Sequence, residues 1–187
     1  MDSRRHRGNM FGSTYHHNRI EAYSAIAVAI LDAGLNCSAS IPCPAEMGGS
    51  IHIHGTGSSI VDTIFVCRKH GTVRRSMLFD SVEQLAEILD EELSALEAAG
   101  MNLSDGDVRC IVFGHLARMA IWRLRGGWDE NMPTAHKLLL VRGEMDRLGT
   151  LETVRRLLGK RNERREIVNT SVCEERAAYG LDDAVAF

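Results

Sequence analysis

Pairs of histidines are the first side chains whose types and spacing suggest chemistry. His16 and His17 are adjacent, and neighbouring side chains on a strand point to opposite faces, so this pair does not chelate one ion. His52 and His54 have the i, i+2 spacing that places two imidazoles on one face of a strand, where they can hold a metal. A third ligand is needed, and Glu46 is the only nearby candidate in sequence. A polar loop beside a hairpin explains the same residues, and we favour that interpretation over a metal site.

Three other patterns suggest chemistry less strongly. Gly55-Thr-Gly57 is similar to a phosphate-binding turn, but such a loop follows a strand and opens a helix, whereas this one leads into a strand. Cys43 lies between two prolines with no neighbouring base to activate it. The basic residues between 155 and 165 are interleaved with glutamates, which favours a solvated, salt-bridged helix over a contact with a phosphate backbone.

Length, charge and hydrophobicity limit the class of protein. The chain has 187 residues, 44% of them hydrophobic and 25% charged, which is ordinary for one domain with a helical appendage. Its net charge of −3 excludes a histone-like polybasic protein. The longest apolar run, Ala25 to Leu31, is much shorter than a membrane span, and the basic N-terminus lacks the apolar core of a signal peptide. Five cysteines without a C-x-x-C pair fit neither a disulfide framework nor a zinc ribbon, so we expect a cytoplasmic protein that does not enter a membrane.

The first part of the chain predicts a strand, a helix and two more strands. Asn18 and Glu21 have the spacing of a helix capping box, and Gly34 is typical of the residue after a helix end. Leu35 to Ile41 alternate apolar and polar side chains until Pro42, which we expect to end that strand. The other expected elements are a β-prone segment over residues 10–18, a helix over 20–31 and a mostly buried strand over 60–67.

The later part of the chain predicts helices only. Ser81 with Gln84 opens an acidic amphipathic helix that ends at Gly100, and either Ser104 or Asp105 caps the next helix. Apolar spacing fades after Gly159, where we expect a loosely held tail. The expected helices of this part run from Ser81 to Gly100, from Val108 to Leu124, from Thr134 to Leu148 and from Leu151 to Leu158.

Five segments, taken in order, resemble one family. They are Thr14-Tyr-His-His-Asn-Arg-Ile-Glu-Ala-Tyr23, Leu31-Asp-Ala-Gly-Leu35, Ile41-Pro-Cys-Pro-Ala-Glu-Met47, Ser50-Ile-His-Ile53 and Ile64-Phe-Val-Cys-Arg-Lys69. Their order is similar to the C-terminal part of the large prokaryotic adenine-specific (N6) DNA methyltransferases, and the resemblance covers residues 11–149. The chain departs from the family at Ile41, Cys43 and Ala45, where the family has Trp, Val and Thr.

The residues that carry the family's chemistry are not in this chain. Its prolines are at 42, 44 and 133, so the Asp/Asn-Pro-Pro-Tyr/Phe motif that grips the flipped adenine is missing, as is the glycine-rich S-adenosylmethionine loop. The resemblance therefore implies the C-terminal segment of an S-adenosylmethionine (SAM)-dependent adenine-specific DNA methyltransferase, truncated or split and inactive alone. It implies that this chain alone binds no cofactor and that SAM belongs to the complete enzyme.

The resemblance also implies a domain organisation. We expect an α/β fold, with a partial open sheet made of the last strands of a Rossmann-like methyltransferase fold, followed by an α-helical extension. Residues 1–75 form the sheet part, residues 76–158 the helical extension and residues 159–187 a charged flexible tail. In that fold the last two strands form an antiparallel hairpin at one sheet edge.

Site residues and partners follow from the same resemblance. Tyr15, His16, His17 and Glu46 are expected near the carboxyl ends of strands, where α/β folds bind ligands and where these side chains could stack on or hydrogen-bond to a flipped base. The implied partners are the missing N-terminal methyltransferase portion and, in the complete enzyme, DNA. The alternative is a non-enzymatic interaction module that pairs through an exposed sheet edge at residues 11–18. The methyltransferase-segment hypothesis predicts marginal stability or a homo-oligomer formed through that edge, because a partial sheet buries less apolar area than a complete domain.

Overall fold

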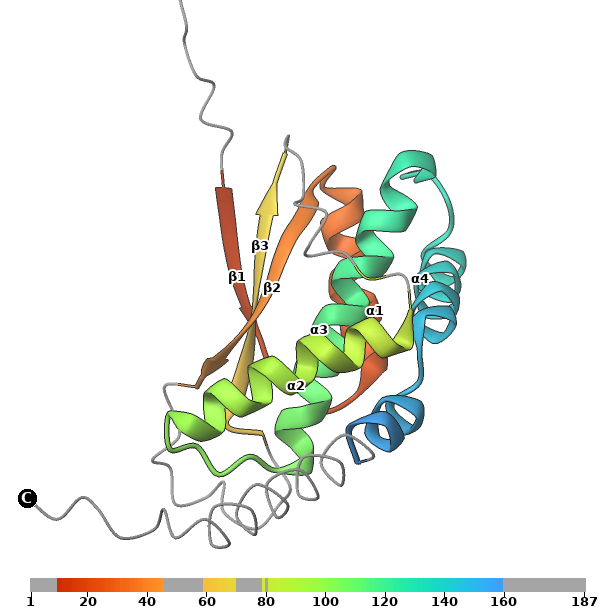
Figure 1. Cartoon of the computed structure of the whole chain (residues 1–187). Helices are drawn as coiled ribbons and strands as arrows, with labels where there is room; N and C mark the ends of the chain where they lie inside the picture. Colours follow the sequence, from red (N-terminus) through yellow and green to blue (C-terminus); the bar gives the residue numbers. More distant parts are fainter. Residues whose placement is uncertain (1–9, 46–58, 70–78, 80, 160–187) are drawn as a thin grey trace, which may run out of the picture.

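A small sheet with helices packed on one of its faces makes up the described part of the molecule (Figure 1). The computed structural model describes residues 10–45, 59–69, 79 and 81–159. Residues 151–159 are also helical. The elements in chain order are β1 (Met10–Tyr15), α1 (Ile20–Asp32), β2 (Asn36–Pro44), β3 (Val61–Arg68), α2 (Val82–Ala98), α3 (Asp105–Leu124), the 3-10 turn η2 (Arg125–Gly127) and α4 (Thr134–Leu148).

The sheet has the strand order β1-β3-β2, with β3 antiparallel to both neighbours. Thr14 lies opposite Ile64, and Ile64 lies opposite Ile41, so these residues form one row across the three strands. Since β1 and β2 are both antiparallel to β3, they run in the same direction and their carboxyl ends meet at the same end of the sheet. The mixed α/β class and the antiparallel strand pair predicted from residues 35–67 are confirmed.

Two details of the predicted boundaries are wrong. Pro42 does not end its strand, because β2 continues to Pro44. Since β2 is an edge strand of the described sheet, a proline whose nitrogen faces away from β3 removes no ladder hydrogen bond. The Asn18 capping box is also wrong: the N-cap of α1 is Arg19, in extended conformation and without a side-chain cap hydrogen bond.

Local signals explain the other helix ends. The Ser81 hydroxyl accepts a hydrogen bond from the Gln84 N–H at 3.2 Å, as the N-cap of α2. Gly34 and Gly100 follow the ends of α1 and α2 with φ of +63° and +87°, a conformation that glycine adopts without the strain a Cβ would add. The predicted starts and stops of these two elements at 81, 34 and 100 are therefore confirmed.

Helix α3 is the centre of the packing. It contacts β2 and β3 on one side and α1, α2 and α4 on its others, and nearly every residue from Gly106 to Ile121 is buried. Gly114 marks the closest approach to the sheet: a Cβ there would lie 2.7 Å from Ser40 Oγ and 2.7 Å from Thr63 Cγ2. One hydrophobic core therefore joins the sheet to the helices that follow it.

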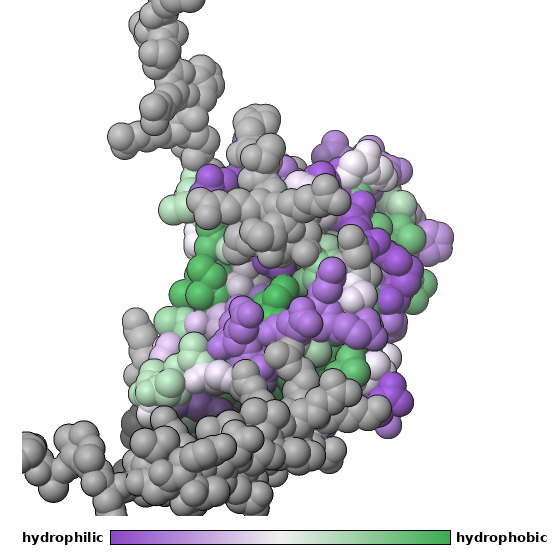
Figure 2. Space-filling model, viewed as in Figure 1, coloured by the Kyte–Doolittle hydropathy of each residue, from purple (hydrophilic) through white to green (hydrophobic). Residues whose placement is uncertain are grey.

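The other face and the outer edge of the sheet are less covered. Ile41 is 46% exposed, and every β1 residue from Met10 to Thr14 is exposed, with Met10 at 64% and Phe11 at 50%. Figure 2 shows hydrophobic residues gathered over this side of the molecule. No helix among the described elements combines the length and the hydrophobicity that a bilayer crossing requires. The expected boundary at residues 75–76 and the expected tail beyond Gly159 lie outside the described residues.

The close approach at Gly114 leads to a stability prediction. Gly114→Ala forces Ser40 and Thr63 to move, and we expect it to lower the free energy of unfolding by about 1–3 kcal/mol despite the better helix propensity of alanine. Gly143→Ala in α4 is the matched control, because a Cβ at Gly143 meets nothing within 4 Å; it should raise that free energy by up to about 1 kcal/mol. Urea unfolding of the two variants measures both effects, and a Gly114→Ala protein as stable as wild type would contradict the packing described above.

Candidate functional site

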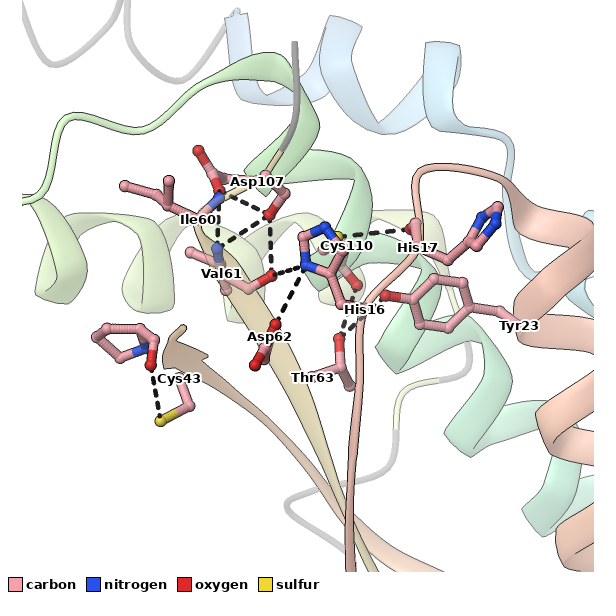
Figure 3. A network of polar contacts seen from close by, with 12 residues as sticks. His16, His17, Tyr23, Cys43, Ile60, Val61, Asp62, Thr63, Asp107 and Cys110 are labelled. Atoms are coloured by element: carbon pink, nitrogen blue, oxygen red, sulfur yellow. Dashed lines mark hydrogen bonds and ion pairs between the residues drawn. The ribbon is translucent and has the colours of Figure 1, made fainter. Parts of the chain in front are cut away.

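Three polar side chains lie across the end of the sheet where β1 and β2 finish. His16 directly follows β1, and its Nδ1 lies 3.1 Å from Asp62 Oδ1. Cys43 of β2 lies opposite Asp62 of β3 in the strand register, so both side chains share one face of the sheet. Asp62 therefore stands between the imidazole and the thiol (Figure 3).

The imidazole of His16 is held at one nitrogen. Nδ1 lies between two acceptors, the Asp62 carboxylate at 3.1 Å and the Val61 carbonyl oxygen at 3.2 Å, so Nδ1 carries the hydrogen in this arrangement. The side chains of His16 and Asp62 are 36% and 21% exposed, which leaves the pair within reach of a ligand. Such a pair can orient an imidazole to exchange a hydrogen bond or a proton with a bound molecule.

Tyr15 and His17 are occupied by the chain itself. The Tyr15 hydroxyl donates to the Ala22 carbonyl oxygen at 3.1 Å, and its ring packs edge-on against Tyr23 with centroids 5.1 Å apart. Burial raises the pKa of Tyr15. Nδ1 of His17 accepts a hydrogen bond from the Arg19 N–H at 3.0 Å, at the start of α1. These two side chains stabilise the turn from β1 into α1.

The structure brings only part of the predicted site together. Tyr15, His16 and His17 are consecutive at the end of β1, and the two imidazoles point in different directions (Figure 3). Glu46 lies outside the described residues, as do His52, His54 and the Gly55-Thr-Gly57 turn. In the described part of the chain no group of three metal-ligating side chains could hold an ion.

The carboxylate of Asp107 joins the start of β3 to the start of α3. Oδ1 accepts hydrogen bonds from the Ser59 hydroxyl at 2.7 Å and from the N–H groups of Ile60 at 2.7 Å and Val61 at 3.0 Å. Oδ2 accepts from the N–H of Ser104 at 2.6 Å and from its hydroxyl at 2.7 Å. Since Asp107 is fully buried, these five donors replace the water that its charge requires.

Burial and hydrogen bonding have opposite effects on the pKa of Asp107. Burial by itself would raise the pKa, but the hydrogen bonds from Ser104, Ser59 and Ile60 outweigh it, and the pKa of Asp107 is lowered below its usual value of 3.8. Ser104 is the N-cap of α3 and forms a complete capping box with Asp107, which decides between the two caps that the sequence allowed.

A second series of hydrogen bonds lies next to the site. The hydroxyls of Tyr23 and Thr63 lie 3.3 Å apart, and Thr63 donates to the Cys110 carbonyl oxygen at 3.1 Å. The Cys110 thiol lies 3.5 Å from the carbonyl oxygen of His17, to which it donates. These hydrogen bonds link α1, β3 and α3, so both the sheet and α3 hold the backbone beside His16.

Sequence reasoning did not single out Asp62 or Asp107. A signal existed for Asp107, because Ser104-Asp-Gly-Asp107 has the S-x-x-D spacing of a capping box. Asp62 is a charged residue within an otherwise apolar strand, which was a weaker signal. Its pairing with His16 joins positions 46 residues apart, and no local pattern predicts that.

The chain matches no protein-family model, and comparisons with curated proteins and with solved structures found no match.

The Asp107 carboxylate leads to a prediction about pH. Asp107→Asn places N–H donors where five donors already point, so we expect the free energy of unfolding at pH 7 to fall by about 2–4 kcal/mol. Because the folded pKa of Asp107 is lowered, its stabilisation is complete above the usual value of 3.8 and is lost as the pH falls through the folded value. The wild type should therefore lose more stability than the variant when the solution is acidified below about pH 4.

Asp105→Asn is the control for that experiment. Asp105 carries the same charge in the same helix turn, but its side chain is 78% exposed and pairs with Arg155 at 2.9 Å. Solvent-exposed pairs contribute about 0–1 kcal/mol, so this variant should unfold almost like the wild type. Denaturant unfolding from pH 3 to 7 compares the three proteins, and equal losses for the two variants would refute a special role for Asp107.

Proposed function

We propose that this chain is the C-terminal segment of a SAM-dependent adenine-specific DNA methyltransferase. It contributes the last strands of the catalytic sheet and a helical extension, acts in the cytoplasm and is inactive alone. SAM binding and base gripping belong to the N-terminal portion of the complete enzyme, which is the first partner that we propose; DNA is the second.

The observation that supports this proposal is the agreement between the family-like motifs and the ends of the elements. The motif containing Tyr15 and His16 falls at the end of β1, and the motif containing Gly34 falls just after α1. Pro42-Cys-Pro44 closes β2, and the segment from Ile64 covers the second half of β3. A strand, a helix and an antiparallel strand pair therefore follow one another in the order that the family resemblance requires.

The His16–Asp62 pair gives the proposed segment a role in substrate binding. Its place at the carboxyl ends of β1 and β2 is where open α/β sheets bind ligands. His16, oriented by Asp62, is proposed to hydrogen-bond to the flipped adenine, and Tyr15 and His17 to position the backbone that carries it. Glu46, which follows β2 in the sequence, is proposed to contact the same base.

The outer edge of β1 supports the proposal that a second polypeptide pairs with this sheet. No strand pairs with this edge among the described residues, and Met10–Tyr15 contains neither a charged residue nor a proline. Natural edge strands are usually protected by such residues. An uncharged, unpaired edge fits a strand that is interior in the complete enzyme, where the N-terminal portion adds the next strand.

The same edge supports the second candidate, a non-enzymatic interaction module. An exposed strand can pair with a partner protein by strand addition, or with a second copy of itself. A self-pairing dimer places the two β1 strands antiparallel about a two-fold axis. The two candidates differ in whether a methyltransferase portion or another copy occupies the edge.

Reconstitution tests the proposed function. Titration calorimetry should show no SAM binding to the isolated chain, and SAM binding with adenine methylation once a polypeptide carrying the Asp-Pro-Pro-Tyr motif and the SAM loop is added. Binding of SAM by the isolated chain would contradict the split-enzyme proposal. A stable dimer by light scattering, with no response to that polypeptide, would favour the interaction module.

A variant of the edge strand sharpens this test. Phe11→Glu places a charge on the β1 edge, and we expect it to weaken association with the N-terminal polypeptide by about tenfold or more, since a buried interface charge without a partner costs several kcal/mol. Leu139→Glu is the matched control, because Leu139 is 69% exposed on α4, away from the sheet. Equal losses of association and methylation in both variants would place the contact elsewhere.

A further inference from the structure

Cys37 and Cys67 are directly opposite each other on β2 and β3. Directly opposed residues of antiparallel strands have Cα atoms about 4.5–5.5 Å apart, within the range of about 4.4–6.8 Å found in disulfides. Both side chains are buried, at 1% and 3% exposure, and both thiols are free. The strand register therefore holds two thiols within reach of one covalent bond.

The surroundings of this pair are polar on one side. Arg118 of α3 is 2% exposed and interacts electrostatically with Cys37. Among the described residues, Nε and Nη2 of its guanidinium have no hydrogen-bond partner. Glu92 also interacts electrostatically with this guanidinium. The charge of Arg118 opposes the rise in the pKa of Cys37 and so favours the thiolate that Cys37 must form when it attacks a disulfide.

The two thiols do not have equal surroundings. The Cys37 thiol donates to the Ala39 carbonyl oxygen at 3.2 Å, and the neighbouring Cys67 thiol and burial raise the pKa of Cys37. Because Cys37 is held in this protonated arrangement, we assign Cys67 as the attacking thiol and Cys37 as the resolving thiol.

We propose that Cys37 and Cys67 form a reversible cross-strand disulfide, a redox modification site for low-molecular-weight disulfides such as oxidised glutathione. Both cysteines lie next to the Asn36–Arg68 pair that ends the two strands, and local opening of this end gives the oxidant access to Cys67. The Cys67 thiolate attacks one sulfur of the oxidant, whose S–S bond breaks and releases one glutathione thiolate. Cys37 then loses its proton, attacks Cys67 Sγ in the mixed disulfide and releases the second glutathione thiolate. The protein loses two S–H hydrogens and two electrons, and the oxidant becomes two molecules of reduced glutathione.

The proposal is independent of the methyltransferase proposal and has a consequence for the sheet. Cys67 also lies opposite Phe11 of β1, so the disulfide would tie β2 to β3 at the row that presents the exposed Phe11. Oxidation is expected to hold this end of the sheet together, while the chemistry at His16 lies at the other end of β1.

A thiol–disulfide equilibrium tests the proposal on the full chain. The variant Cys43→Ser/Cys110→Ser/Cys173→Ser retains only this pair and is equilibrated with reduced and oxidised glutathione, with and without urea. After alkylation, the peptides that contain Cys37 and Cys67 should be linked, and the equilibrium constant for disulfide formation should be about tenfold or more higher in the folded chain, because folding raises their effective concentration. By linkage, oxidation should raise the midpoint of thermal unfolding.

Controls separate this outcome from others. Cys37→Ser in the same background should stop at the glutathione mixed disulfide of Cys67 and show no rise in the unfolding midpoint. Arg118→Met should lower the oxidation rate of the pair at neutral pH while the linked product still forms. The proposal would be overturned if the equilibrium constant for disulfide formation in the folded chain were equal to or below that in the unfolded chain. It would also be overturned if the linked peptides of the oxidised wild type contained Cys43 or Cys110 instead.

Discussion

The described fold depends on one buried carboxylate. Asp107 receives five hydrogen bonds, three from the start of β3 and two from the N-cap of α3. A buried charge with this many donors ties two segments that are separated by about 45 residues into one junction. Asp62 and Thr63 come directly after this junction in β3. The junction therefore fixes their positions and, through Asp62, the position of His16.

Helix α3 extends this junction through the centre of the molecule. It is buried on nearly all sides, so it needs internal partners for its polar side chains: His115 Nε2 lies 2.7 Å from Glu92 Oε2 of α2. A second contact joins Lys137 of α4, whose side chain is 6% exposed, to the more exposed carboxylate of Asp32 at the end of α1, at 2.7 Å. Each pair joins one helix to another. The side chains of His115 and Lys137 are 2% and 6% exposed, so loss of the acidic partner would leave a buried polar group with little access to water.

The helices leave one face and the outer edges of the sheet uncovered among the described residues. Helices cover one face of it, and β3 is its only interior strand among the described residues. β3 carries Asp62 at one end and Cys67 at the other, so the proposed ligand site and the proposed disulfide lie at opposite ends of the same strand. The unpaired edge of β1, with its exposed Phe11, is where the proposed partner would complete the sheet.

Much of the local structure could be predicted from the sequence. Hydrophobic alternation, the Ser81 cap and the glycines at 34 and 100 depend on neighbours within a few residues, and the corresponding elements are confirmed. The prediction for Pro42 was wrong because a proline's effect depends on whether its strand has one neighbour or two. The prediction for Asn18 was wrong because the chain after β1 is held by Tyr15 and His17 instead.

The sequence by itself determined which segments become helices and strands, because those choices are made by contacts within a turn or a pleat. Only the tertiary structure decided that β3 lies between β1 and β2, that Asp62 meets His16 and that Cys37 faces Cys67. These pairings join residues about 30 to 46 positions apart, and they follow from register and from the burial of one sheet face against α3, which no local pattern encodes.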